Sequence, residues 1–392
     1  MDELFEHLAT TREAREELYV WFHQHPELSM QEVQTRARIS KELMRMGLEP
    51  QECGGGVVAV VRNGEGPTVL VRADFDALPM AEESGKPYAA DPELGRMHSC
   101  GHDVHTTALL GATETLATCT DAWSGTFIAL FQPGEEIAAG AQSMLDDGLA
   151  DLIPTPDVAL AQHVLTGLPG GCVGGVPGPF LSTAKNITVR IQGKGGHGSM
   201  PHLAVDPVVI ASSTVIRLQT IVARELAPGT FGVVTVGSVQ AGTSANIIPD
   251  SATLQINIRA FDESVAQHLT ESIERIARSE AAAAGAPEPT FEYSNFYPLT
   301  DNDPQAAEQV MDAFRATFGE QAVPFEGAQA SEDFSVIPRA LGVPYFYWGL
   351  GGFADPENAP GNHNPAFAPD MQPTLDRGSE AILAAAGAWL IR

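Results

Sequence analysis

The feature of this sequence that most constrains its fold is an alternation of strand-like and helix-like segments. Short apolar runs typical of buried strands occupy residues 57–62, 68–73, 126–131, 157–162 and, much later, 343–350. Helices are expected over residues 10–23, 30–47 and 103–119. Such alternation predicts an α/β fold in which helices cover the faces of a mixed sheet.

A segment with a different order of elements interrupts this pattern. A Gly- and Pro-rich stretch, residues 167–180, marks its start. The strands and helices predicted beyond it follow the order βαββαβ, over residues 186–192, 206–224, 231–240, 252–261, 262–284 and 290–296. This order is typical of the ferredoxin-like split βαβ sandwich. We therefore predict two domains, because 392 residues exceed what one core usually supports. They are a discontinuous larger domain, 1–182 and 297–392, and an inserted smaller domain, 183–296.

Composition disfavours several classes of partner. The 50 acidic and 22 basic residues give a formal charge of −28, which argues against nucleic acid or an anionic membrane. No run of 18 apolar residues predicts a membrane span, and the charged N-terminal segment lacks the apolar stretch of a signal peptide. The four cysteines form no CxxC pair, so a disulfide scaffold is not expected. We expect a cytoplasmic protein.

Candidate metal ligands follow the predicted strands. In open α/β sheets, ligands bind beyond the carboxyl ends of the strands. The acidic and histidine side chains found there are Asp74, Asp76, Glu135, Glu136, His163 and His363. The segment HSCGHDVH, residues 98–105, adds further candidates where the 103–119 helix opens. One Cys, three His and one Glu are a suitable ligand set for two borderline-soft divalent metals.

Each of these residues also has an ordinary structural interpretation. A single Asp or His at a strand end is more often a hydrogen-bonding group, and adjacent glutamates usually lie at a solvated edge. Cys100 alone would be a small buried hydrophobe, and His98 and His105 would be polar neighbours. The metal centre is favoured because five segments deliver such side chains to one rim. A thiolate ligand disfavours Mg²⁺ and Ca²⁺, so we expect Zn²⁺, with Mn²⁺, Co²⁺ or Ni²⁺ able to substitute.

A two-metal centre beside a spare carboxylate has a definite chemistry. Two metals can hold a water, lower its pKa and polarise an amide carbonyl. A free carboxylate must then take the proton from the water and pass it to the leaving amine. Adjacent glutamates cannot easily place both carboxylates on one metal. One of Glu135 and Glu136 is therefore expected to be a ligand and the other the base.

Seven motifs together resemble a known family. In chain order they are RADFDALP, MHSCGHDVHT, FQPGEE, GGHGSMPH, SANIIPD, SEDF and HNPAF. The sequence resembles the aminoacylase/carboxypeptidase metallohydrolases, specifically the branch of hippurate hydrolases, N-acetyl-amino-acid deacetylases and indole-acetyl-amino-acid hydrolases. The resemblance extends from Trp21 to Phe367. It implies a metal-dependent amidohydrolase that cleaves N-acyl amino acids to a carboxylic acid and a free amino acid.

The resemblance also implies roles for individual residues. The residues that match ligands to two divalent ions are Cys100, His102, Glu136, His163 and His363. Glu135 matches the general base, and Asp76 matches a carboxylate behind the ligands.

In the inserted domain, the resemblance implies a homodimer. The histidine that matches His197 reaches the metal site of a neighbouring subunit and helps to stabilise the oxyanion. Asn246 and Arg259 match residues that hold the carboxylate of the substrate. An exposed sheet arginine is the alternative interpretation of Arg259. In a chain of charge −28, however, a fixed cation would be needed to hold an anionic substrate.

Other functions fit the sequence less well. Residues 193–202 contain G-x-G-x-x-G, but the next helix begins only near Asp206, unlike a dinucleotide-binding fingerprint. No G-x-S-x-G occurs, which disfavours a serine hydrolase. A dipeptidase or carboxypeptidase of the same family is the alternative enzyme. A metal-dependent ligand-binding protein without turnover is the alternative of another class, and Glu135 disfavours it because binding alone needs no free base.

Overall fold

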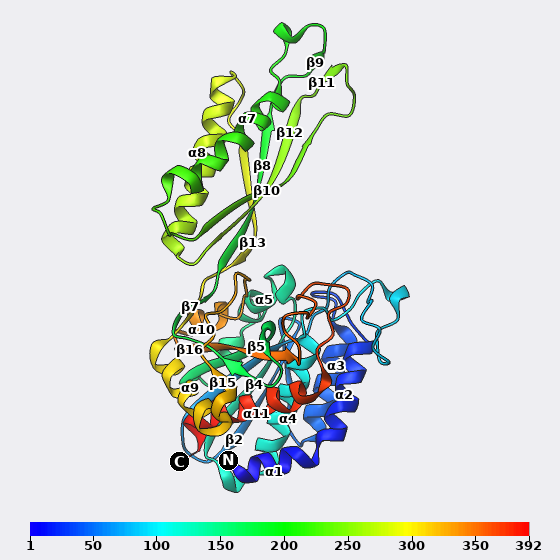
Figure 1. The fold of residues 1–392 in the computed structure, drawn as a ribbon, viewed down its shortest axis with the longest axis vertical. Helices are drawn as coiled ribbons and strands as arrows, with labels where there is room; N and C mark the ends of the chain where they lie inside the picture. Colours follow the sequence, from blue (N-terminus) through cyan, green and yellow to red (C-terminus); the bar gives the residue numbers. More distant parts are fainter. Residues whose placement is uncertain (392) are drawn as a thin grey trace. The chain divides into compact units, whose positions relative to one another are not determined.

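The predicted alternation produces two main sheets of different kind, each in its own unit of the chain (Figure 1). The structure is a computed structural model that describes residues 1–391. Leu181–Leu299 and Gln329–Glu332 form the second unit, and the remaining residues form the first. The insertion therefore extends slightly beyond the predicted 183–296, and it takes in a short segment for which no element is predicted.

The first unit contains, within the described residues, an eight-stranded mixed sheet with the order β1-β2-β4-β3-β5-β16-β6-β15. Its strands are β1 (Gln51–Cys53), β2 (Gly56–Asn63), β3 (Thr68–Asp74), β4 (Gly125–Gln132), β5 (Val158–Pro169), β6 (Val173–Gly174), β15 (Ala322–Val323) and β16 (Tyr345–Phe353). The pairs β4–β3, β3–β5 and β5–β16 are parallel, so the carboxyl ends of these strands meet at one edge. Because these central strands are buried on both faces, their sequences are continuous apolar runs.

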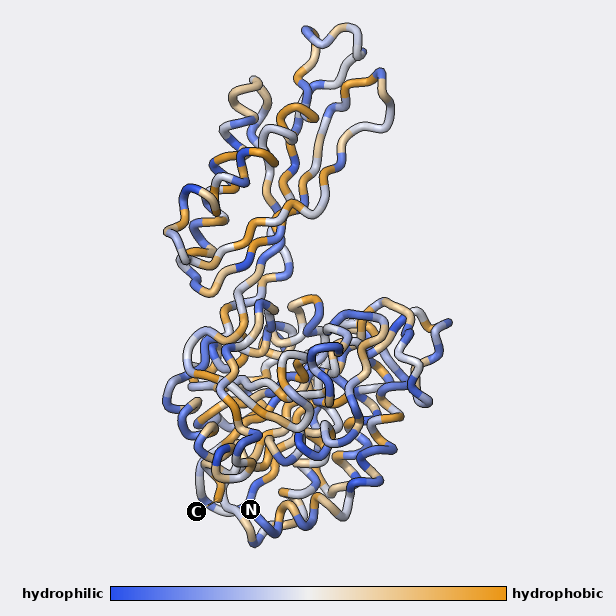
Figure 2. Tube along the Cα trace, in the orientation of Figure 1, coloured by the Kyte–Doolittle hydropathy of each residue, from blue (hydrophilic) through white to orange (hydrophobic). Residues whose placement is uncertain are grey.

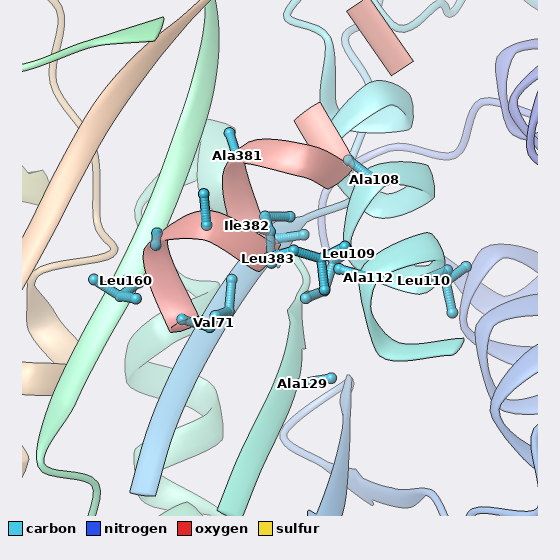
Figure 3. Packing of buried hydrophobic residues seen from close by; sticks show 14 of the residues in the cluster. Val71, Ala108, Leu109, Leu110, Ala112, Ala129, Leu160, Ala381, Ile382 and Leu383 are labelled. Carbon is cyan, nitrogen blue, oxygen red and sulfur yellow. The ribbon is translucent and has the colours of Figure 1, made fainter. Parts of the chain in front are cut away.

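Helices cover this sheet and bury its core. They are α1 (Asp2–Thr10), α2 (Arg12–Gln24), α3 (Val33–Arg45), α4 (His102–Thr118), α5 (Gly140–Asp146), α6 (Leu149–Leu152), α9 (Pro304–Phe318), α10 (Val336–Leu341) and α11 (Met371–Leu390). Alanine-rich α4 and α11 pack on each other and on strands β3 and β5 (Figure 3). The helix predicted over 10–23 is observed as α2, and α1, which ends just before it at Thr10, is not predicted from the sequence.

The second unit contains an antiparallel sheet with the order β10-β12-β8-β13. Its elements are β8 (Thr183–Gln192), β9 (Gly196–His197), α7 (Pro207–Thr220), β10 (Gly232–Ala241), β11 (Ile247–Ile248), β12 (Ser251–Ala260), α8 (Glu263–Ala283) and β13 (Thr290–Tyr297). In β12, Leu254, Ile256 and Ile258 are buried and the residues between them are more exposed, as the alternation predicts. Both helices of this unit carry hydrophilic and hydrophobic residues in mixture (Figure 2). The predicted α/β fold class is confirmed.

The Gly- and Pro-rich stretch 167–180 is more structured than its composition suggests. Strand β5 continues to Pro169, and the stretch also contains β6 and the start of β7 (Gly178–Leu181), which pairs with β14 (Thr300–Asn302). Glycine permits these close packings: a Cβ on Gly174 would lie 2.4 Å from the Val323 carbonyl oxygen. Within residues 1–391, no helix has the length and apolar character needed to cross a membrane.

A buried histidine ties α2 to the N-terminal turn of α4. His23 Nδ1 lies 2.7 Å from an Asp103 carboxylate oxygen, and His23 Nε2 lies 3.0 Å from a Glu82 carboxylate oxygen. Since carboxylates accept, both ring nitrogens donate and the imidazole is cationic. Burial lowers the pKa of His23, but the hydrogen bonds to Asp103 and Glu82 outweigh burial and raise it to about 9.

The stability of the protein should therefore decrease in mildly alkaline solution. A histidine whose pKa rises on folding stabilises the fold fully below its unfolded value and loses that contribution as pH rises through about 9. Between pH 6.5 and 9.5 we expect the wild type to lose about 1–3 kcal/mol of unfolding free energy through this group. Urea denaturation across that range measures the loss. His23→Gln should flatten the dependence, and His25→Gln, which removes a bond to the Trp21 carbonyl, should not.

Candidate metal centre

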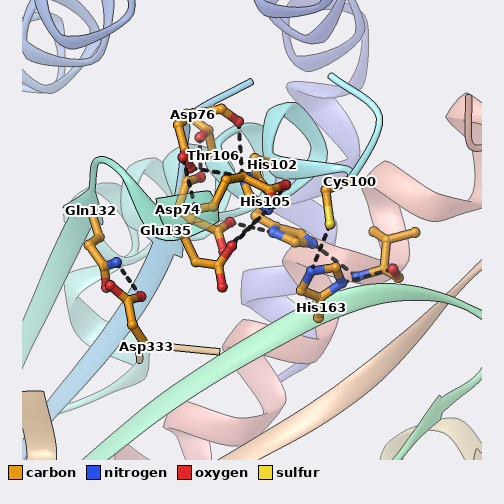
Figure 4. A network of polar contacts seen from close by, with 12 residues as sticks. Asp74, Asp76, Cys100, His102, His105, Thr106, Gln132, Glu135, His163 and Asp333 are labelled. Carbon is orange, nitrogen blue, oxygen red and sulfur yellow. Dashed lines mark hydrogen bonds and ion pairs between the residues drawn. The ribbon is translucent and has the colours of Figure 1, made fainter. Parts of the chain in front are cut away.

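Five side chains predicted as ligands converge at the carboxyl edge of the first unit's sheet. Figure 4 shows Cys100, His102 and His163 pointing toward one another. The Cys100 Sγ lies 3.4 Å from His163 Nε2, and His363 Nε2 lies 3.3 Å from a Glu136 carboxylate oxygen. The ligand atoms of Cys100, His102 and His163 lie within 4.8 Å of one another, and so do those of Cys100, Glu136 and His363. The thiol thus belongs to both groups, which is the arrangement expected where two metals share a ligand.

Each predicted ligand is placed by a different local structure. Cys100 stands just before α4, and His102 is the first residue of that helix after the left-handed Gly101. Glu136 lies in a 3₁₀ turn, η3 (Glu135–Ile137), that follows β4. His363 adopts a left-handed φ of 66° in the loop after β16. The prediction that His163 follows its strand is wrong, because β5 continues past it to Pro169 and His163 pairs with Gly349 inside the sheet.

Hydrogen bonds fix the tautomers of two histidines that are predicted to be ligands. His102 Nδ1 donates to the Asp76 carbonyl oxygen at 2.9 Å and lies 3.1 Å from Asp76 Oδ1. His163 Nδ1 donates to the Val164 carbonyl oxygen at 2.9 Å. Because both Nδ1 atoms carry the proton, both Nε2 atoms present lone pairs to the cluster. Asp76 therefore orients His102, one of the predicted ligands, and Figure 4 shows it behind His102.

The donor atoms fit metal ions. His102 Nε2 and Glu136 Oε1 are buried and have no hydrogen-bond partner among the described residues. Buried polar atoms without a partner are rare, and here both atoms face a cluster of other donors. One sulfur, three imidazole nitrogens and a carboxylate oxygen match borderline-soft divalent ions.

A chain of buried polar groups lies beside the predicted ligands. His105 Nε2 accepts the Val164 N–H at 2.9 Å, so its Nδ1 carries the proton and donates to Asp74 Oδ1 at 2.6 Å. Asp74 also binds the fully buried Arg72 guanidinium at 2.5 Å. Burial raises the pKa of Asp74, but Arg72 and the histidines more than compensate and hold it well below its usual range. The sequence predicts only a polar neighbour at His105. The structure shows that His105 links β3 to β5 through its hydrogen bonds to Asp74 and Val164.

Asn362 completes this support from the loop that carries His363. Its side-chain amide donates to the Val164 carbonyl oxygen at 3.1 Å and lies 3.7 Å from the Cys100 Sγ. The Val164 peptide therefore joins His105, His163 and Asn362. Sequence reasoning gave no role to Arg72 or Asn362. The available signals were that Arg72 is the one charged residue in the apolar run 68–73 and opens the RADFDALP motif, and that Asn362 directly precedes His363.

Glu135 lies beside the cluster without being needed in either of the two groups that contain Cys100. It is 5 % exposed, and one of its carboxylate oxygens lies 4.0 Å from His102 Nε2. In Figure 4 its carboxylate points toward the histidines. Its ligand atom also lies within 4.8 Å of those of His102 and Glu136, and a buried carboxylate this close to the predicted ligands has the placement of an acid/base group.

The second unit brings two of its three predicted residues together. His197 pairs with Ile247 in the β9–β11 ribbon, and the Gly198 N–H donates to the Asn246 carbonyl oxygen at 2.9 Å. Arg259 lies elsewhere, near the far end of β12, where its guanidinium donates to the Gln329 carbonyl oxygen at 3.0 Å and lies 3.2 Å from the Ser331 hydroxyl. Eight residues of strand from Ser251 to Arg259 span about 26 Å.

The tautomer of His197 suits a hydrogen-bond donor. Its Nδ1 accepts the Ser199 N–H at 3.1 Å, so in the neutral ring the proton is on Nε2. The side chain is exposed, which leaves that donor available.

Comparisons with known proteins agree with this geometry. The model of Peptidase family M20/M25/M40 matches residues 70–387. The N-acetylcysteine deacetylase of Bacillus subtilis is 34% identical over 354 residues, 89% of this chain and 90% of that protein. Thermostable carboxypeptidase 2 of Saccharolobus solfataricus is 34% identical over 334 residues, 83% of each chain. The crystal structure of Bacillus subtilis YxeP, a dinuclear metal binding peptidase from the M20 family, has a TM-score of 0.80 at 30% identity and covers 96% of this chain and 98% of its own. This chain belongs to Peptidase family M20/M25/M40, in its amidohydrolase branch, and is a hydrolase of that family whose clustered side chains could hold metal ions.

Proposed function

We propose that this hydrolase cleaves the amide bond of N-acyl amino acids, releasing a carboxylic acid and a free amino acid. The observation that carries the proposal is the buried Glu135 carboxylate beside two ligand groups that share Cys100. Such a site has both a place to activate water and a group to move its proton. A relative named for the deacetylation of N-acetylcysteine supports an N-acyl amino acid as the substrate class.

The residues divide into those that would hold the metal ions and one, Glu135, that would move a proton. Cys100, His102 and His163 would hold one ion, and Cys100, Glu136 and His363 the other. When bound, the ions would polarise the scissile carbonyl and lower the pKa of the attacking water. We propose Zn²⁺ for both, because thiolate and imidazole ligands favour it over Mg²⁺ and Ca²⁺. Glu135 would take the proton of the water and return it to the leaving amine.

The spacing within the second unit supports a homodimer. If His197, Asn246 and Arg259 all contact one substrate, they cannot come from one chain. About 26 Å of strand separates Arg259 from the end of β12 that leads to the β9–β11 ribbon, far more than the length of an N-acyl amino acid. A twofold partner would supply the His197 and Asn246 that one site lacks.

The second unit also presents a surface that a second copy would cover. Val209 and Ile216 lie seven residues apart on α7, so they share one face, and they are 61% and 73% exposed. Helix α7 packs against β10, the edge strand of the sheet, on which Val239 is 53% exposed. An apolar helix stripe beside an unpaired strand edge favours pairing with an identical copy.

Hydrolysis of a substrate panel tests the proposed function. We expect the metal-loaded protein to hydrolyse N-acetyl and N-benzoyl amino acids with higher kcat/KM than dipeptides, and elemental analysis to find up to two transition-metal ions per chain. Faster turnover of dipeptides would instead establish a dipeptidase or carboxypeptidase, an alternative supported by the carboxypeptidase relative. A fully metal-loaded protein that binds these compounds without turnover would be a ligand-binding protein and would overturn the proposal.

A further inference from the structure

A short segment before α3 contacts the backbone that carries the metal centre's two glutamates. The Gly134 N–H, immediately before Glu135, donates to Glu32 Oε1 at 2.9 Å. Three residues earlier, the Ser29 hydroxyl donates to Asp76 Oδ2 at 2.6 Å, and the same oxygen accepts the Glu136 N–H at 3.0 Å. This segment therefore reaches the η3 turn directly through Glu32 and indirectly through Asp76.

The η3 turn needs such external support. It is bracketed by two left-handed residues, Gly134 with φ 56° and Ala138 with φ 53°. A non-glycine residue in that region costs about 1–2 kcal/mol, so the surrounding contacts must maintain it. The Gly134 carbonyl oxygen already accepts the N–H groups of Ala139 and Gly140. A Cβ on Gly134 would lie 2.6 Å from the sulfur of Met30, so the turn packs closely against the segment.

Glu32 lowers the stability of the fold at this position, because its carboxylate is buried. It is 3% exposed, and among the described residues no Lys, Arg or His forms an ion pair with it. The charged group that faces it is another carboxylate, Asp76, and the remaining contacts are the amides of Met30, Gly134 and Glu32 itself. Burial and then Asp76 raise the pKa of Glu32 to about 7. A buried carboxylate without a cation lowers stability, so its hydrogen bond to the turn is its evident contribution.

We propose that Glu32 is a positioning residue that holds the η3 turn through the Gly134 N–H. The turn presents two consecutive carboxylates with different tasks, Glu135 beside the cluster and Glu136 within it. A small rotation of the turn would exchange the positions of the Glu135 and Glu136 carboxylates, or bring both into the cluster. Glu32 keeps them apart without touching substrate or metal. This inference rests on the proposed function and deepens it.

The same segment supplies a matched control. Glu27 is also a buried carboxylate, 5% exposed, but its Oε2 accepts the Thr35 N–H at 2.9 Å and the Thr35 hydroxyl at 3.0 Å. It therefore caps the first turn of α3 and makes no side-chain bond to the η3 turn. Loss of either glutamate removes a buried hydrogen bond, whereas only loss of Glu32 frees Gly134.

The experiment compares Glu32→Ala, Glu32→Gln and Glu27→Ala in the metal-loaded full chain. We expect Glu32→Ala to lower kcat about tenfold to a hundredfold, the usual effect of misplacing a reacting group by about 1 Å, with KM changed less than threefold. It should also weaken binding of the second equivalent of Zn²⁺, measured by calorimetric titration. Glu32→Gln retains an acceptor oxygen and should restore both values, and Glu27→Ala should lower only the melting temperature.

Two results would overturn the inference. One is a Glu32→Ala protein that melts early, like Glu27→Ala, but keeps wild-type kcat and Zn²⁺ affinity, because the role would then be structural. The other is a Glu32→Gln protein as impaired as Glu32→Ala, because charge rather than the hydrogen bond would then matter. If the wild type hydrolyses none of the substrates, the proposed function fails, yet the Zn²⁺ titration still tests the position of Glu136.

Discussion

Glu135→Gln is expected to lower kcat by about 10²–10⁴-fold while leaving the fold and the metal content unchanged. The amide matches the shape of the carboxylate but cannot accept the proton of the attacking water. Glu135 is 5% exposed and lies within ligand distance of His102 and Glu136, but neither group that contains Cys100 includes it, so we expect its replacement to leave both ions bound. Steady-state kinetics on an N-acyl amino acid and elemental analysis of the dialysed protein measure the two effects.

Glu136→Gln is the matched comparison, since it is the next residue on the same turn. Its Oε1 is buried without a hydrogen-bond partner among the described residues, and its Oε2 lies 3.3 Å from His363 Nε2. We expect this variant to lose metal occupancy as well as activity. Equal loss of metal in both variants would show that the division of roles between the two glutamates is wrong.

The second large effect concerns His197, whose replacement by Ala should lower kcat by about 10²–10³-fold. The reason is the loss of an Nε2–H donor that would face the developing oxyanion. The decisive measurement mixes two inactive variants, His197→Ala and Glu135→Gln. If His197 acts across a dimer interface, each mixed dimer contains one site with both residues intact. Free exchange at equal concentration should then restore about a quarter of wild-type activity.

A control for exchange is needed before this result is interpreted. Subunits carrying distinguishable tags show by co-purification whether mixed dimers form. If they form and the activity stays at zero, His197 acts within its own chain or has no part in the reaction. Val209→Asp on the exposed α7 stripe should independently convert the protein to a monomer, as measured by analytical ultracentrifugation.

The candidate metal centre shows what sequence reasoning can predict. Parallel strands end at one edge, so Asp, Glu and His residues that follow apolar runs are brought together by topology alone. This reasoning predicted which residue types would lie at the centre, but it gave no distances between their side chains. It placed His163 beyond its strand, because periodicity does not mark where a buried strand stops.

Sequence reasoning did not predict the contacts between segments that are distant along the chain. The bond from Glu32 to Gly134 joins residues 102 positions apart, and the contact of Asn362 with Val164 joins residues 198 apart. A hydrogen bond depends on the final position of both atoms, and no local pattern encodes a partner so far away. The roughly 26 Å between Arg259 and the end of β12 that leads to the His197 ribbon likewise follows from strand length and register.

The sequence by itself therefore determined what depends on neighbouring residues: the α/β alternation, the βαββαβ insertion and the chemical types of the donor atoms. Hydrophobic periodicity and residue chemistry are local properties, so they can be read along the chain. Tertiary structure alone decided which nitrogen of His102 and His163 carries a proton, which carboxylates support the ligands, and which substrate-binding candidates lie together. Those properties depend on distances of a few ångströms between segments, and only packing sets such distances.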